Sequence, residues 1–294
     1  AALQRAIDNL FLNTKTTPEN RRIIKLAPGL YKIDSSLKIP PYTTLVGSGK
    51  DKTIIEQTAN SPIFVTVNGS STVGNYDETS GLSASNQAKY ISISGMTLRY
   101  ENAVSNIYNT AINLQSVEDG HFFDLKLKGY WDGDGIQSNS IGINIKSFSG
   151  AVRSKRNLFE NIDIEGFAYG VNSSFDIEDN TFRDITFSTL LNGVRLGNNM
   201  PVVDYTDAAD LADKLGDGVA YGPNNTLFEN CTFKEVFEQG FIVNKGTANT
   251  SKRNKYFDVG NAGGTSATTT SSIIKFDTIG NETIEDWFER TYDL

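Results

Sequence analysis

The chain has 294 residues, with 27 Lys or Arg against 35 Asp or Glu, so its net charge is −8. An acidic chain without a basic cluster is a poor partner for nucleic acid or an anionic membrane. One histidine and one cysteine exclude a multi-histidine metal site and an internal disulfide framework, and no apolar run reaches the roughly 20 residues of a membrane span. We therefore expect no metal, no cofactor and no membrane span.

The first predicted element is an amphipathic helix over residues 2–12, because Leu3, Ile7, Leu10 and Phe11 recur at helical spacing. We expect residues 1–20 to form a cap and lead-in at one end of the fold. The chain opens at Ala1 without a signal-peptide pattern, so we also expect that a leader or a longer N-terminal region preceded it. No linker marks a boundary, which favours one domain over residues 1–294.

A repeated pattern follows, with the order apolar, any residue, turn-former, apolar, polar, apolar. Its copies are residues 93–98, 122–127, 159–164, 182–187, 228–233 and, in part, 256–259. The third position favours a left-handed backbone, and we expect its members to lie one above another. They are Gly95, Asp124, Asn161, Asp184, Asn230 and Asp258. Each copy therefore predicts a strand, a sharp bend and a second strand.

The shortest repeat, 23 residues from Phe159 to Phe182, gives the length of a bare coil. We interpret the 46 residues from Phe182 to Phe228 as one coil with an insertion, because residues 198–225 carry their own helix signal. Other insertions are expected near 68–90 and 128–140. A further short strand begins at Gly142, Gly170, Gly193 and Gly240.

At the C-terminal end, Thr283 and Asp286 are spaced as in a capping box, and Ile284, Trp287 and Phe288 share one helical face. We expect a second capping helix over residues 281–294, with β-helix coils over 21–280. Crossover helices do not fit between such closely spaced strands, which excludes a βαβ fold. The sequence predicts an all-β, single-stranded, right-handed parallel β-helix; an antiparallel sandwich remains an alternative.

The N-terminal quarter resembles a known superfamily. Residues 24–33, 37–41, 44–49 and 53–55 are similar to the opening coils of pectate-lyase-like right-handed β-helices. The resemblance implies that fold and several functions, since the superfamily includes lyases, hydrolases, epimerases and non-catalytic phage tailspike and baseplate proteins. The Arg-x-Pro-x-x-Arg and Gly-His-Gly patterns of its enzymes are missing. The composition is most like virion proteins of tailed, T4-like marine phages.

The segment after the second repeat offers the best binding chemistry. Tyr130, Trp131, Asp132 and Asp134 combine aromatic rings with carboxylates, as glycan-binding sites do; an Asp-Gly turn packed on the flank is the structural alternative. This segment also resembles half of a calcium loop, but the glutamate at the twelfth position is missing.

A glycosidase needs two carboxylates about 5 to 9.5 Å apart. Asp132 with Asp134 is the candidate pair, and Glu160, Asp163 and Glu165 are further candidates on the next coil. We expect His121 to be an ordinary turn residue at a coil edge. We expect Cys231 to be a small core residue, because it aligns with Ile162 and Ile185.

Three functions are consistent with the sequence. The first is a structural protein of a phage tail (tail fibre, tailspike or baseplate), located in the virion and acting outside the cell. It would contact host-surface polysaccharide or other tail proteins within a homo-oligomer or larger assembly. The second is a polysaccharide lyase or glycoside hydrolase, and the third is a cellular adhesin.

Overall fold

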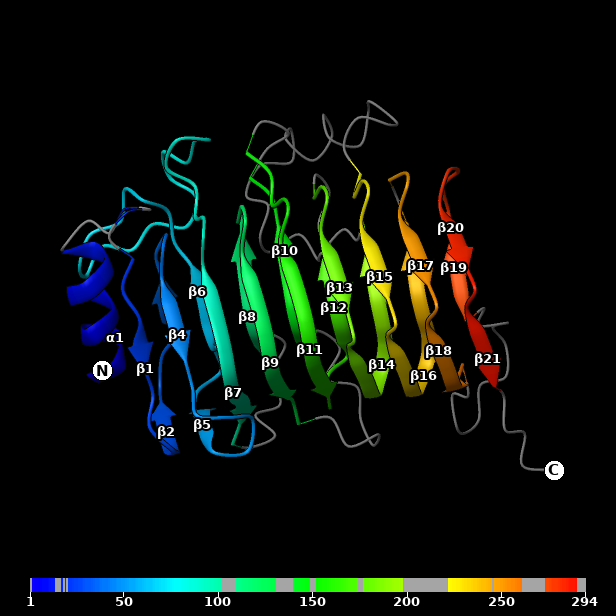
Figure 1. The fold of residues 1–294 in the computed structure, drawn as a ribbon, viewed down its shortest axis with the longest axis horizontal. Coiled ribbons are helices and arrows are strands. Elements are labelled where there is room, and N and C mark those ends of the chain that lie inside the picture. The colour runs from blue at the N-terminus through cyan, green and yellow to red at the C-terminus, as the bar shows by residue number, and fades with distance from the viewer. Residues whose placement is uncertain are drawn as a thin grey trace.

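The structure is a computed structural model that describes residues 2–13, 17, 19, 21–101, 109–130, 140–148, 152–173, 177–197, 222–244, 246–260 and 273–289. The strands lie side by side along the long axis of the molecule, with the helix α1 (Ala2–Ile7) at one end and β21 (Trp287–Glu289) at the other (Figure 1). All the strand pairs of the ladder are parallel, and together they form one continuous 21-stranded sheet. The fold is a parallel β-helix.

Each coil contributes to three columns of stacked strands. The first column contains β1 (Ile24–Lys25), β4 (Thr44–Val46), the start of β7 (Ser92–Tyr100), β9 (His121–Lys128) and β11 (Leu158–Glu165), then β13 (Thr181–Arg183), β15 (Leu227–Glu229), β17 (Thr250–Lys252) and β20 (Glu282–Ile284). The second contains β2 (Gly29–Ile33), β5 (Thr53–Gln57), the ends of β7, β9 and β11, the starts of β14 (Thr186–Leu196) and β16 (Thr232–Val243), then β18 (Lys255–Val259) and β21.

The third column contains β3 (Leu37–Ile39), β6 (Phe64–Thr66), β8 (Thr110–Gln115), β10 (Ile141–Lys146), β12 (Tyr169–Ser173), the ends of β14 and β16, and β19 (Ile274–Phe276). Phe182 pairs directly with Phe228 across adjacent coils, which confirms that an insertion lies between them. The expected insertion near 68–90 lies between β6 and β7. The helix signal in 198–225 and most of the expected insertion near 128–140 lie outside the described residues.

The predicted bend column is confirmed for five of its members. Gly95, Asp124, Asn161, Asp184 and Asn230 all have φ between 52° and 68°, and the strand register stacks them in this order. The expectation for Asp258 was wrong. It has φ of 53°, but the register places it over Glu235, in a different bend column. The sixth position belongs to Arg253, with φ of 52°.

Aromatic rings fill much of the interior. Phe122, Phe159, Phe182 and Phe228 form one stack with ring centroids 4.3 to 5.1 Å apart. Phe187, Phe233, Tyr256 and Phe288 form a second stack, with centroids 4.5 to 5.1 Å apart. Nearly parallel rings at this spacing match the distance between neighbouring strands, so each coil extends the contact made by the one before.

The N-terminal cap is confirmed. The helix α1 continues into a π-helix over Asp8–Leu12, and the side chains of Ile7 and Phe11 are buried against the first coils. The Gln4 side chain holds α1 in place, because its amide donates to the carbonyl oxygen of Lys38 and its oxygen accepts from the Lys38 N–H. No helix in the described ranges is long and apolar enough to cross a membrane.

The predicted C-terminal helix is wrong. Glu282–Ile284 and Trp287–Glu289 are strands, and Glu285 between them has φ of 54°, so the repeat continues where a helix was expected. Asp286 does not cap a helix: its carboxylate accepts from Ser251 Oγ at 2.5 Å and from the Asn254 N–H at 2.8 Å. Residues 290–294 lie outside the described residues.

These contacts are part of a cluster of polar side chains inside the last described coils. Ser251 lies in the column of Phe228, and its hydroxyl also contacts the Tyr256 hydroxyl at 2.8 Å. Burial raises the pKa of Asp286 above its ordinary value, although the hydrogen bonds from Ser251 and Asn254 act in the opposite direction. A buried polar cluster therefore lies beside the end of the second aromatic stack.

We predict that Asp286→Asn stabilises the chain at neutral pH. Below the ordinary value near 3.8 the carboxyl is protonated in both the folded and the unfolded chain. As the pH rises, the Asp286 carboxyl ionises first in the unfolded chain. The free energy of unfolding therefore falls until the pH passes the raised pKa of Asp286 in the folded chain. Thermal unfolding followed by circular dichroism should show a higher Tm for the variant at pH 7 and no difference near pH 3. An equal gain at both pH values would contradict this explanation.

Candidate functional site

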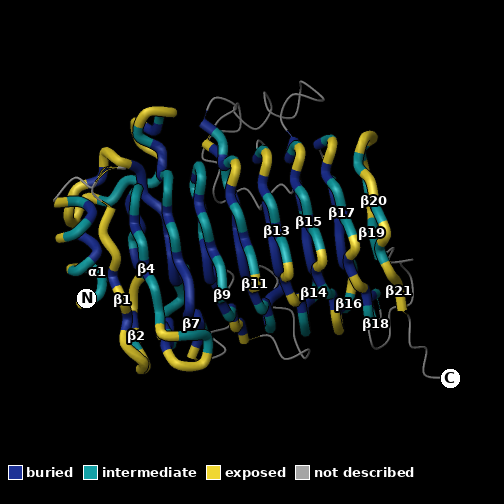
Figure 2. The backbone as a smooth tube through the Cα atoms, viewed as in Figure 1, coloured by how far each residue is buried: buried dark blue, intermediate teal, exposed yellow. Residues whose placement is uncertain are grey.

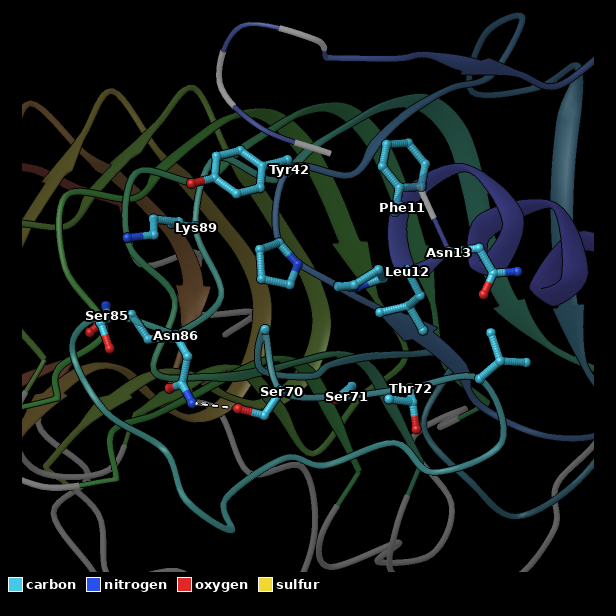
Figure 3. Close-up of a pocket in the computed structure, with 15 residues that line it drawn as sticks. Phe11, Leu12, Asn13, Tyr42, Ser70, Ser71, Thr72, Ser85, Asn86 and Lys89 are labelled. Carbon is cyan, nitrogen blue, oxygen red and sulfur yellow. Dashed lines mark hydrogen bonds between the residues drawn. The ribbon is translucent and has the colours of Figure 1, made fainter. Parts of the chain in front are cut away.

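A cavity of about 470 Å³ lies at the N-terminal end of the β-helix (Figure 3). Three separate parts of the chain enclose it: the end of the cap at Phe11, the turn at residues 40–42 that follows β3, and the insertion between β6 and β7. The volume lies within the range of small-ligand sites, about 300 to 1,000 Å³.

One side of the cavity is aromatic. Figure 3 shows the rings of Tyr42 and Phe11 on the same side, and Pro40 and Pro41 of the turn also line the cavity. Tyr42 has φ of 64° and stacks on Tyr90 with ring centroids 5.6 Å apart. The Arg21 guanidinium lies 4.7 Å from the centroid of the Tyr90 ring. These contacts fix the orientation of the Tyr42 ring, and burial raises the pKa of its hydroxyl, so it stays a neutral hydrogen-bond donor.

The opposite side of the cavity is polar. Asn86 organises it, because its side-chain amide donates to Ser70 Oγ at 2.7 Å and to the Gly81 carbonyl oxygen at 3.0 Å. The Asn86 carbonyl oxygen accepts from the Gly69 N–H, which joins the two ends of the insertion. The hydroxyl groups of Ser70, Ser85 and Thr72 line this side (Figure 3).

Lys89 also lines the cavity. Its side chain is half-buried, and its ammonium forms no ion pair in the part of the chain that the structure describes. Its backbone carbonyl accepts from the Tyr42 N–H at 2.8 Å, which holds the lysine next to the aromatic side. An aromatic side, a hydroxyl-rich side and a free cation together suit a saccharide: C–H groups of the ring pack on the aromatics, and its hydroxyls bond to the polar groups.

Of the four predicted glycan-binding residues, the described part of the chain includes one, Tyr130. Tyr130 comes two residues after the end of β9, and the residue is 43% exposed. Trp131, Asp132 and Asp134 lie outside the described residues. The cavity residues were not identified from the sequence, since their three segments share no motif and come together only in the folded chain.

The candidate carboxylates of β11 all lie in ion pairs. Glu160 accepts from Arg183 Nη2 at 2.8 Å, and Asp163 accepts from Lys50 Nζ at 3.0 Å. Glu165 lies 3.2 Å from Lys128 Nζ. A carboxylate held by a cation is a poor general acid, so these contacts favour a structural role that ties neighbouring coils together. In the described ranges no group of three or more His, Cys, Asp or Glu is placed to hold a metal ion.

The surroundings of the single histidine and the single cysteine favour a structural role for both. His121 begins β9 rather than lying in a turn, and its ring stacks on Phe123 at 4.3 Å. Cys231 is fully buried, which confirms it as a core residue. Burial raises the pKa of its thiol to about 12, so it is not a nucleophile at neutral pH.

Comparison with known proteins agrees with the fold and identifies the family. The chain is a pectate-lyase-like β-helix protein. Residues 1–208, more than half of the chain, match the family described as rhamnogalacturonase A/epimerase, pectate lyase-like, and the chain belongs to that family. No curated protein matches the sequence.

Several solved structures are similar. The pre-mature gene product 12 of bacteriophage phi29 is 13% identical with a TM-score of 0.51, and the match covers 90% of this chain and 30% of that one. A hydrolase titled 1,3-α-1,4-β-D-galactose-4-sulfate-3,6-anhydro-D-galactose-2-sulfate 4 galactohydrolase is 15% identical with a TM-score of 0.53, covering 87% and 55%. ORF18 of Geobacillus virus E2 is 18% identical with a TM-score of 0.48, covering 88% and 48%.

This chain therefore spans about half or less of the length of these structures. For the phi29 protein and the galactohydrolase, whose TM-scores exceed 0.5, the similarity at such identities shows a shared fold alone.

Proposed function

We propose that this chain is a structural component of a phage tail that binds a host-surface glycan in the N-terminal cavity. The observation that carries the proposal is the arrangement of the cavity, with Tyr42 and Phe11 opposite Ser70 and Asn86. Lys89 at the same cavity favours a glycan that bears a carboxylate or sulfate group. The fold is shared with a phage protein, which supports a place in the virion.

A second contact is proposed at the segment that begins with the exposed Tyr130. Trp131, Asp132 and Asp134 follow it in the sequence and supply the ring and the carboxylates that saccharide hydroxyls need. The two sites belong to different parts of the coil stack, so a long glycan that reached both would bind more tightly than either site alone.

The competing function is hydrolysis or elimination of a polysaccharide. The fold shared with a galactohydrolase favours it, and Asp132 with Asp134 remains its candidate carboxylate pair. The ion pairs of Glu160, Asp163 and Glu165 argue against the neighbouring coil as a source of the general acid.

We predict that Tyr42→Asn lowers glycan affinity about tenfold or more, because it removes the ring while asparagine keeps the left-handed backbone. A glycan array followed by calorimetry on the best ligand measures the change. Ile279→Asn, which removes an 89% exposed apolar side chain near the other end of the described chain, is the control and should leave the affinity within about twofold. Unchanged affinity in Tyr42→Asn together with loss in Tyr130→Asn would place the glycan at the Tyr130 segment instead.

We also predict that the best glycan ligand is bound without being cleaved. Reducing-sugar and unsaturated-product assays on that glycan should give no signal above buffer. Turnover that disappears in Asp132→Asn or Asp134→Asn would contradict the structural function and establish the enzyme.

A further inference from the structure

On the polar side of the cavity, the hydrogen bonds of Asn86 are all made within the protein. Its side-chain amide donates to Ser70 Oγ at 2.7 Å and to the Gly81 carbonyl oxygen at 3.0 Å. Its side-chain oxygen accepts from the Ser83 N–H at 2.8 Å and from the Ser83 hydroxyl at 3.1 Å. An asparagine side chain has two N–H donors and an oxygen with two lone pairs, so these bonds use its whole capacity. Asn86 therefore fixes the wall of the cavity and leaves no group free for a ligand.

The backbone of the insertion is satisfied in the same way. The Ser70 N–H donates to Asn68 Oδ1 at 2.8 Å, and the Thr72 N–H donates to the Asn75 carbonyl oxygen at 3.0 Å. Backbone groups that are already paired gain little from a ligand. Contacts to a ligand on this side must therefore come from side chains that keep a free O–H group.

Ser70 keeps such a group. Its oxygen accepts from Asn86, and its hydroxyl hydrogen has no acceptor among the described residues. No Asp or Glu is among the described residues that line the cavity, so a strong acceptor for this hydrogen has to come from the ligand. A carbonyl oxygen, which only accepts hydrogen bonds, is the best match for such a donor.

An apolar side chain lies close to this donor in the insertion. Val73 follows Ser70 by three residues, lines the same cavity and is 50% exposed. Phe11 and Leu12 of the cap also line the cavity (Figure 3). A sugar hydroxyl placed against Val73 would lose its hydrogen bonds to water, whereas an apolar group there would be stabilised. The cavity therefore favours a sugar that carries an apolar substituent next to an acceptor.

We propose, on the basis of the glycan function inferred above, that the sugar in this cavity carries an acetyl group, held as an amide or as an ester. The carbonyl oxygen of the acetyl group accepts from the Ser70 hydroxyl, and its methyl group packs on Val73. The ring of the same sugar packs on Tyr42. Val73 is then the residue that distinguishes an acetylated sugar from a plain one.

A free amino or hydroxyl group at the same position fits the cavity less well. An ammonium group brings only donors to the Ser70 hydroxyl. Its positive charge would also share the cavity with the Lys89 side chain, and like charges repel. A hydroxyl group can accept from Ser70 but leaves Val73 uncovered. The expected order of affinity is the acetylated sugar first, then the hydroxyl form, then the amino form.

The test compares the best ligand from the glycan array with the same glycan after its acetyl groups have been removed. Calorimetry on the full chain should show an affinity at least about tenfold lower for the deacetylated form, because a hydrogen bond and a methyl contact are both lost. Mild alkali cleaves acetyl esters and leaves acetamides intact. Treatment with mild alkali and a separate N-deacetylation therefore show which of the two linkages the cavity binds.

Val73→Thr is the matched variant, because it replaces one methyl group by a hydroxyl and keeps the shape of an exposed side chain. It should weaken binding of the acetylated glycan about fourfold and leave binding of the deacetylated form unchanged. Ile279→Thr, at an 89% exposed residue near the other end of the described chain, is the control and should change neither affinity. Tyr42→Asn should weaken both forms, since the contact with the ring does not depend on the acetyl group.

A best ligand without an acetyl group would overturn the proposal, as would equal affinity for the acetylated and deacetylated forms. Equal weakening of both forms in Val73→Thr would also contradict it. If Tyr42→Asn still weakens binding in these cases, the glycan function stands and the acetyl group alone is wrong. If no glycan on the array binds, or Tyr42→Asn leaves the affinity unchanged, the proposed glycan function fails and the acetyl group fails with it.

Discussion

The structure depends on the in-register stacking of one coil on the next. Residues with left-handed backbone turn the chain at the same place in each coil, which lets neighbouring strands pair in parallel. Glycine is needed where backbones approach closely: a Cβ at Gly170 would lie 2.6 Å from the Gly193 carbonyl oxygen and 2.6 Å from the Phe187 ring. A larger residue there would clash with the backbone of the next coil and with Phe187 of the second aromatic stack.

The same stacking explains where function can reside. A β-helix uses its interior for packing, so binding must use the insertions, the outer flank or the ends. The insertion between β6 and β7 closes a cavity against the N-terminal cap. The cap buries Ile7 and Phe11 at the N-terminal end, so the proposed glycan site depends on both the cap and this insertion.

The sequence was sufficient to predict the coil length, the N-terminal cap and five members of the bend column, because turn-formers and apolar positions recur with a fixed spacing. Asp258 was misplaced because a second bend column accepts the same residue types. Arg253 and Glu285 were missed because neither is a usual residue for a left-handed backbone, and the stacked coil imposes that conformation on them. The spacing of Thr283 and Asp286 suggested a helix, but pairing with β17 and β18 overrides this local signal.

The candidate site was harder to predict. Tyr42, Asn86 and Lys89 are far from Phe11 in sequence and meet only because the cap folds over the first coils. Sequence patterns indicate local structure and periodic packing, whereas this cavity depends on one long insertion whose path is set by the Asn86 hydrogen bonds.

Engineered cysteine pairs test the coil register most directly. Lys126 and Asp163 are register partners on the outer face of neighbouring coils, so Lys126→Cys with Asp163→Cys should form a disulfide under mild oxidation. Lys126→Cys with Glu165→Cys is the control pair, which is displaced by two residues from the register. Its Cα atoms lie beyond the roughly 7 Å that a disulfide spans, so this pair should stay reduced. A disulfide in the displaced pair and none in the register pair would contradict the stacking on which the structure depends.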